Sequence, residues 1–158
     1  MATIIVIYYS QTGNTKKMAE LIAEGAGKAG AAVAVKDVKE VSARELLDYD
    51  GIIMGSPTYY GTMAWQLKKL LDESVRFHGS LDGKAGGAFA SSANVAGGNE
   101  TTVLDILNAM LIHGMILQGD CEGDHYGPVA IGAPDARASK GCRRFGERFA
   151  KLAARLIR

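Results

Sequence analysis

Residues 3–15 have the sequence TIIVIYYSQTGNT, and this stretch decides the fold. Its first seven residues are apolar or β-branched without alternation, which is typical of a strand buried on both faces. From Asn14 onward, apolar residues recur three and four positions apart, as on one face of a helix. A buried strand that runs directly into a helix predicts the first unit of a parallel α/β sheet.

The rest of the chain repeats this alternation. Further strands are expected at residues 31–38, 51–55, 84–91 and 115–118, with 129–131 continuing or pairing with the last one. Helices are expected at residues 42–49, 62–77 and 100–112 and around Phe145, Phe149, Leu152 and Leu156. The pattern predicts one domain, residues 1–158, with a doubly wound five-stranded parallel sheet of strand order 2-1-3-4-5 and helices on both faces.

Two of these helices have more detailed expectations. Ser42 and Glu45 have the spacing of a capping box at the start of the short helix. In the helix at 62–77, the inner face is expected to consist of Leu67, Leu70, Leu71 and Val75.

Composition and charge exclude several classes of protein. The 158 residues carry a net charge of +1, and 47% are hydrophobic, as in ordinary globular domains. There is no run of eighteen apolar residues and no signal-peptide pattern, so we expect no membrane insertion and a cytoplasmic location. Cys121 and Cys142 are expected to be free thiols.

Charge is distributed unevenly along the chain. Residues 1–133 have a net charge of −5, whereas residues 134–158 have a net charge of +6. The basic segment is either a solvated helix face or a docking face for an acidic partner or an anionic cofactor such as NADPH. No aromatic residues interleave with basic ones in the manner of a nucleic-acid module, so we expect no nucleic-acid partner.

Two motif matches do not have the structural context that they require. Gly25, Gly27 and Gly30 match a dinucleotide fingerprint, but they close a predicted helix instead of opening one. Cys142 and Arg148 have the spacing of a phosphatase loop, but they fall inside the periodic last helix. Both matches are therefore interpreted as parts of helices.

The first candidate site follows the first strand and opens the first helix. It consists of Ser10, Gln11, Thr12, Gly13, Asn14 and Thr15. A helix N-terminus offers free N–H groups and the positive end of the dipole, and the polar side chains add donors for an anion. Because no lysine is placed for β/γ-phosphates, a single terminal phosphate fits better than a nucleoside triphosphate.

Two more loops follow the third and fourth strands. One contains Pro57, Thr58, Tyr59, Tyr60, Gly61 and Thr62, and the other contains Ser91, Ser92, Ala93, Asn94, Val95, Ala96 and Gly97. In the predicted sheet these loops meet the first one at the carboxyl ends of neighbouring strands, where such folds bind ligands. A phosphate loop, an aromatic loop and a small polar loop together predict an FMN site.

At this point the chain resembles the flavodoxin superfamily, whose phosphate loop is similar to SQTGNT at residues 10–15. Further segments resemble the tryptophan-repressor-binding-protein type of NAD(P)H:quinone oxidoreductase, in a short variant. These segments are GSPTYYGTM at 55–63, GGNETT at 97–102, HGM at 113–115 and YGPVAIG at 126–132.

The resemblance implies that the three loops hold FMN and that His113 lies at the flavin. It implies a small oxidoreductase that takes electrons from NADH or NADPH and reduces a quinone-like acceptor. Two alternatives remain open: a flavodoxin-type electron carrier between redox proteins, and an interaction protein with a vestigial site. A homo-oligomer is also left open, since the chain is shorter than the quinone reductases in segments that form their subunit contacts. No metal is expected.

Overall fold

Five parallel strands lie in the spatial order β2-β1-β3-β5-β6, so the predicted strand order is confirmed. The computed structural model describes residues 1–157 of the chain. The bounds of these strands are Thr3–Tyr8 (β1), Ala32–Asp37 (β2), Gly51–Tyr59 (β3), Ala85–Ser92 (β5) and Ile116–Leu117 (β6). β1 and β5 are the most enclosed, as expected for apolar strands with helices on both sides.

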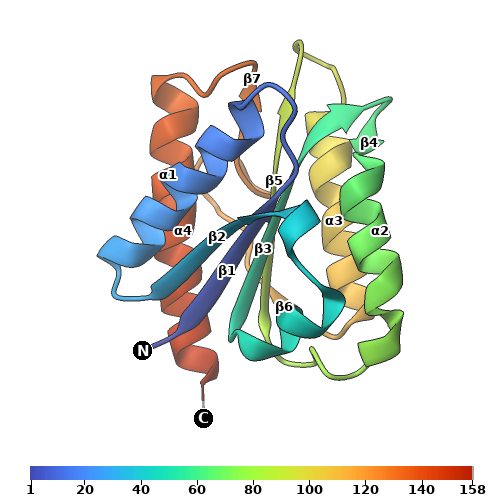
Figure 1. The fold of residues 1–158 in the computed structure, drawn as a ribbon. Coiled ribbons are helices and arrows are strands. Elements are labelled where there is room, and N and C mark those ends of the chain that lie inside the picture. Colours follow the sequence, from blue (N-terminus) through green and yellow to red (C-terminus); the bar gives the residue numbers. More distant parts are fainter. Residues whose placement is uncertain (158) are drawn as a thin grey trace.

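Two helices cover each face of the sheet (Figure 1). One layer consists of α1 (Asn14–Lys28) and α4 (Ala136–Leu156), and the other of α2 (Trp65–Glu73) and α3 (Asn99–Ile112). Each layer packs its apolar side chains on the sheet and forms its own hydrophobic core. The sheet therefore separates two cores, and its connecting loops lie at its two ends.

The short helix predicted at residues 42–49 is a 3₁₀-helix, η2 (Ala43–Asp48). The Glu45 N–H donates to Ser42 Oγ, which is one of the two bonds of the predicted capping box, while Glu45 Oε1 accepts from Lys36 Nζ and the Tyr49 hydroxyl. A similar turn, η1 (Val38–Glu40), follows β2.

The α1–α4 layer is held by close backbone contact. A Cβ atom added at Gly25 would overlap the Arg143 carbonyl, and one added at Gly146 would overlap the Ile22 carbonyl. Gly25 therefore serves helix packing, which confirms that the fingerprint match belongs to a helix end. Cys142 is buried within α4, and burial raises the pKa of its thiol to about 12, so it is a core residue.

The segment after β3 differs from the prediction. β3 extends to Tyr59, past the predicted end at residue 55, and pairs with β4 (Thr62–Met63) in a hairpin. The predicted helix at 62–77 begins at Trp65 and tightens into a 3₁₀-helix, η3 (Ser74–Phe77). This change of helical period turns Val75 outward, 69% exposed, so its expected inner-face position is wrong.

The basic α4 binds an acidic loop of its own chain. Between β6 and β7 (Val129–Ile131) the chain leaves the sheet. β6 pairs with the beginning of β5, and β7 pairs with the end of the same strand. Arg144 forms two hydrogen bonds to Asp120, which lower the pKa of that carboxyl to about 2. Arg137 Nη1 donates to both carboxylate oxygens of Asp124. Much of the predicted basic face is thus neutralised within the molecule.

Both cysteines are free, as expected. Within residues 1–157, no helix is long and apolar enough to cross a lipid bilayer.

Candidate functional site

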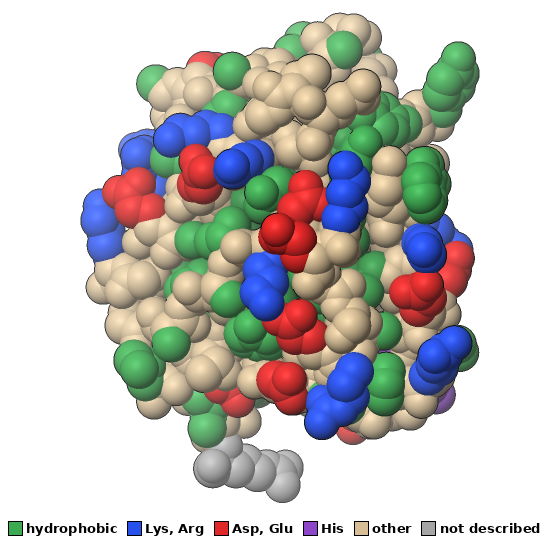
Figure 2. All heavy atoms as spheres, in the orientation of Figure 1, with side chains coloured by type: hydrophobic (Ala, Val, Ile, Leu, Met, Phe, Trp, Pro, Cys, Tyr) green, Lys and Arg blue, Asp and Glu red, His purple; other side chains and the backbone are tan. Residues whose placement is uncertain are grey.

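The three predicted loops lie together at the carboxyl ends of β1, β3 and β5. In Figure 1 this is the upper end of the sheet, above the ends of these strands. Figure 2 shows that the same end of the molecule is mostly tan and green, with few charged side chains. The site is therefore a largely uncharged region of surface.

The first loop leaves the N-terminus of α1 open. Gly13 precedes the helix with φ 98°, a left-handed conformation that favours glycine, and no side chain caps the helix. The first helical bond runs from the Lys17 N–H to the Gly13 carbonyl. The N–H groups of residues 14–16 precede that bond and face the loop side of the helix.

The surroundings of this helix end fit a phosphate. The first turn of α1 contains no acidic residue, although acidic residues normally stabilise a helix start. Lys16 and Lys17 lie in that turn and are exposed. An anion bound here would supply the negative charge that the chain itself leaves out, so the residues present fit the terminal phosphate of FMN.

The second loop is the tip of the β3–β4 hairpin. Tyr60 and Gly61 join the two strands with φ values of 50° and 80°, as in two-residue turns of type I′. Tyr59 packs edge-on against Tyr9, with ring centroids 6.4 Å apart. Tyr60 is fully exposed. The hairpin therefore holds one ring against the sheet and one in solvent.

The third loop is small and exposed. Ser91 and Ser92 are buried at the end of β5, and Ala93, Asn94, Val95 and Ala96 are exposed. The Gly97 N–H donates to the Asn94 carbonyl, closing a tight turn. Ala96 has φ 55°, an uncommon value for a residue other than glycine. This loop offers backbone polar groups and no bulky side chain.

Direct hydrogen bonds join the three loops. The hydroxyls of Thr15 and Ser91 are 2.9 Å apart and buried, linking the first loop to the third. The Tyr59 hydroxyl donates to Gln11 Oε1 at 3.0 Å, linking the second loop to the first. The structure thus brings together all the predicted loop residues, from Ser10 to Gly97, in one region.

A set of supporting residues on α3 was missed by the sequence analysis. The Thr101 hydroxyl donates to the Gly61 carbonyl at 2.6 Å, and the Thr102 hydroxyl donates to Thr58 Oγ1 at 3.1 Å. The Thr62 hydroxyl donates to Asp105 at 2.6 Å. Together these contacts clamp the hairpin to α3. The sequence signal that could have identified them is the close spacing of the polar residues Thr101, Thr102 and Asp105 on one predicted helix.

His113 does not lie with the loops. It caps the C-terminus of α3. The carbonyl of the next residue, Gly114, accepts a hydrogen bond from the N–H of Gly83, which lies just before β5 begins. This is the opposite end of the sheet from Ser92, so within one chain the expected position at the flavin is wrong. The reason is topological: α3 starts beside the loops and runs antiparallel to β5, which carries its last residue away from them.

His113 is also not the cation that its helix-end position suggests. Its side chain is buried, and its Nε2 is 2.7 Å from Ser74 Oγ. Since the Ser74 hydroxyl hydrogen goes to the Leu71 carbonyl, Nε2 carries the proton of this pair. Burial, and then the neighbouring His78, lower the pKa of His113. Its neutral form is therefore favoured.

Comparisons with known proteins agree with this architecture. The family model described as "Flavodoxin" matches residues 6–105. A protein of Aquifex aeolicus named flavodoxin is 40% identical over 98% of this chain and 88% of its own length. A protein of Archaeoglobus fulgidus named NAD(P)H dehydrogenase (quinone) is 35% identical over 99% of this chain and 100% of its own.

Solved structures lead to the same family. The crystal structure described as a flavodoxin, WrbA-like protein from Agrobacterium tumefaciens has 28% identity and a TM-score of 0.83. The match covers 99% of this chain and 100% of that one. The family model and these relatives, together with the sheet order and the open start of α1, show that the chain belongs to the flavodoxin family. Membership of this family implies that it binds FMN.

Proposed function

We propose that the protein is an FMN-dependent oxidoreductase that takes electrons from NADH or NADPH and reduces a quinone-like acceptor. The observation that carries this proposal is the exposed third loop, in which Ala93 to Ala96 present no aromatic ring. A nicotinamide must stack on an uncovered flavin face to transfer hydride. The relatives named NAD(P)H dehydrogenase (quinone) support the same activity.

The roles of the protein groups follow from the geometry of the loops. The N–H groups at the start of α1, with Thr12 and Asn14, would bind the phosphate. The hairpin around Tyr59 would flank the ring, and the backbone of residues 92–97 would hydrogen-bond its polar edge. FMN, when bound, accepts two electrons as hydride and passes them to an acceptor. The chain binds and orients the cofactor and leaves one side of it open.

Steady-state kinetics test the proposal. FMN-loaded protein is mixed with NADH or NADPH and a benzoquinone, and nicotinamide oxidation is followed by absorbance. We expect saturable turnover with at least one nicotinamide and none with protein stripped of FMN. Absence of turnover with both nicotinamides, although FMN is bound, contradicts the proposal.

A second function, electron transfer between redox proteins, is favoured by the length of the chain. This chain has 158 residues; its alignment to the Aquifex flavodoxin spans 163 positions, close to that length, whereas its alignment to the Archaeoglobus dehydrogenase spans 190. The carrier function predicts no nicotinamide oxidation. It predicts instead that chemically reduced protein passes electrons to a protein acceptor such as cytochrome c. The nicotinamide assay therefore gives opposite results for the two functions.

A further inference from the structure

The tip of the β3–β4 hairpin is held differently from its base. At the base, Met63 is buried and belongs to the hydrophobic core on the α2–α3 side of the sheet. At the tip, the side chain of Tyr60 is fully exposed, and the next residue, Gly61, is half-buried. Core packing therefore fixes the base of the hairpin, and polar contacts decide where its tip lies.

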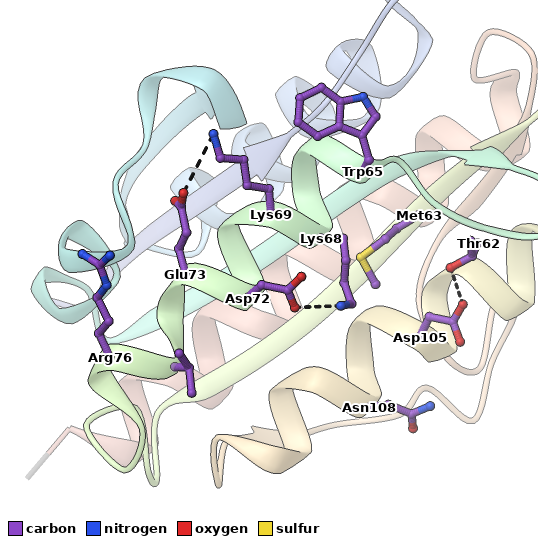
Figure 3. Close-up of a pocket in the computed structure, with 11 residues that line it drawn as sticks. Thr62, Met63, Trp65, Lys68, Lys69, Asp72, Glu73, Arg76, Asp105 and Asn108 are labelled. Atoms are coloured by element: carbon purple, nitrogen blue, oxygen red, sulfur yellow. Dashed lines mark hydrogen bonds and ion pairs between the residues drawn. The ribbon is translucent and has the colours of Figure 1, made fainter.

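One of these polar contacts lies at the edge of a hollow. Figure 3 shows Thr62 of the hairpin and Asp105 of α3 pointing toward each other, joined by their 2.6 Å hydrogen bond. The hollow between α2 and α3 has a volume of about 990 Å³, and it is lined by both residues and by Met63 and Asn108 among others. Because this side of the hairpin faces a hollow instead of packed side chains, its distance from α3 depends on hydrogen bonds.

Thr101 makes the contact nearest to the turn. Its hydroxyl oxygen lies 2.6 Å from the Gly61 carbonyl and 2.9 Å from the Gly98 carbonyl, and a hydroxyl has one hydrogen to donate. The Gly98 carbonyl already accepts from the Thr102 N–H at 3.0 Å, at the start of α3. Gly61 lies in the turn, outside the pairing of β3 with β4. The shorter distance and the satisfied Gly98 carbonyl assign the Thr101 hydrogen to Gly61.

The tip of the hairpin also touches the end of the third loop. Gly98 follows that loop and precedes α3 with φ 99°. A Cβ atom added to Gly98 would lie 2.9 Å from the Gly61 Cα and 3.2 Å from the Thr101 hydroxyl oxygen. The backbones of the second and third loops thus meet beside Thr101. One hydroxyl group therefore helps to set the spacing between two of the three loops.

We propose that Thr101 is a positioning residue for the flavin ring. Its hydroxyl fixes the hairpin tip at one distance from the third loop, so the site for the ring is formed before FMN binds. The inference rests on the proposed function, in which the hairpin around Tyr59 flanks the ring. A site that is already formed loses less conformational entropy on binding, so removal of the hydroxyl weakens the binding of FMN.

Replacement by side chains of similar shape tests this role. Thr101→Val keeps the branched shape and removes the hydroxyl, whereas Thr101→Ser keeps the hydroxyl. In fluorescence titrations of the apoprotein with FMN, the valine variant is expected to bind about two- to tenfold more weakly, the range for one hydrogen bond. The serine variant should bind like the wild type. Because Thr101 is exposed, both apoproteins should keep the wild-type melting temperature.

A second ligand separates this role from a general loss of structure. Inorganic phosphate competes with FMN for the start of α1 but has no ring for the hairpin to hold. Thr101→Val should therefore leave the inhibition constant of phosphate unchanged, whereas Thr12→Asp should raise it. In the valine apoprotein, hydrogen exchange should become faster at the amides of residues 60–62 and stay unchanged at those of residues 13–16.

Asn108→Leu is the matched control. Asn108 is exposed on α3 and lines the same hollow, but it lies one turn beyond Asp105, so its loss should not change the affinity for FMN. The inference is overturned if Thr101→Val binds FMN as tightly as the wild type. It is also overturned if serine fails to restore the affinity, or if the valine variant loses phosphate to the same extent as FMN.

Failure of this inference differs from failure of the proposed function. The titrations measure binding to the apoprotein and involve no nicotinamide. The proposed function fails if FMN-loaded wild-type protein oxidises neither NADH nor NADPH, whatever the Thr101 variants bind.

Discussion

Three hydroxyl groups in the first loop have different partners. Ser10 Oγ accepts from the Gly13 N–H at 3.0 Å, and Thr15 is buried against Ser91. Thr12 is exposed beside the open start of α1. Ser10 and Thr15 therefore shape the loop, and Thr12 is the hydroxyl most available to a ligand. The sequence alone gives the three hydroxyls the same role.

Thr12→Asp is expected to weaken FMN binding at least tenfold. The change places a carboxylate beside the phosphate and removes a hydroxyl donor, and a lost charge-assisted hydrogen bond alone costs about 1.5–3 kcal/mol. Fluorescence titration of the apoprotein measures the dissociation constant. Thr12→Asn, which is similar in size and uncharged, is the control and should bind more tightly than the aspartate variant. Equal affinity of wild type and Thr12→Asp would place the phosphate elsewhere.

His113 makes stability depend on pH. Because its folded-state pKa is lowered by burial and by His78, the unfolded chain takes up a proton first as pH falls below about 6.5. The folded state therefore loses stability from that pH down to the folded-state pKa of His113. Urea denaturation at pH 7.5 and 5.5 measures the loss.

A matched variant identifies the responsible group. His113→Gln cannot take up the proton, so the difference between the two pH values should shrink although the variant is less stable at both. The same substitution should leave the affinity for FMN unchanged, because His113 lies at the far end of the sheet. A loss of FMN binding with full stability would return this residue to the site.

At the scale of elements, the contact between α1 and α4 depends on glycine at specific positions. Gly146→Ala is expected to destabilise the fold by about 1–3 kcal/mol, because the new methyl group overlaps the Ile22 carbonyl. Gly27→Ala is the matched control, since nothing lies within 4 Å of its added Cβ. It should raise stability by about 0.5–1 kcal/mol through helix propensity. Thermal unfolding of both variants shows whether the signs are opposite.

Apolar periodicity predicted the elements whose burial is uniform, and it failed where backbone geometry changes within one element. The strand at 3–9 and the helix at 100–112 were placed within one residue of their observed bounds. The β3–β4 hairpin was missed because its turn, Tyr60-Gly61, places tyrosine where asparagine or aspartate is usual. Val75 was misplaced because the switch to a 3₁₀-helix leaves no mark in the pattern of apolar residues.

The candidate site shows a similar division. Loops at neighbouring strand ends were predictable because parallel topology brings those ends together. The hydrogen bond from Thr101 to the Gly61 carbonyl was not predictable, because it depends on how close the tip of the β3–β4 hairpin lies to α3. His113 was misplaced because its motif resembles a family segment, whereas the direction of α3 determines which end of the sheet it reaches.

For the whole molecule, FMN is expected to act as part of the fold. A ligand that binds only the folded state stabilises it by about 2.7 kcal/mol at a hundred times its dissociation constant. The purified protein should be yellow, and added FMN should raise the melting temperature of the apoprotein. FAD should do so less, since one anion site is available at α1. The Thr12→Asp variant at the same FMN concentration is the control and should gain less.

The interrupted edge of the sheet has a consequence for solubility. β6 contributes two residues and β7 three, and between them the chain turns away to the loop that α4 holds. An exposed edge is a template on which a strand from another molecule can add. At this edge an incoming strand could pair with at most three consecutive residues, because β6 and β7 are that short. A fold built around a long apolar sheet thereby avoids edge-to-edge polymerisation on this side, without needing a charged or proline-rich edge strand.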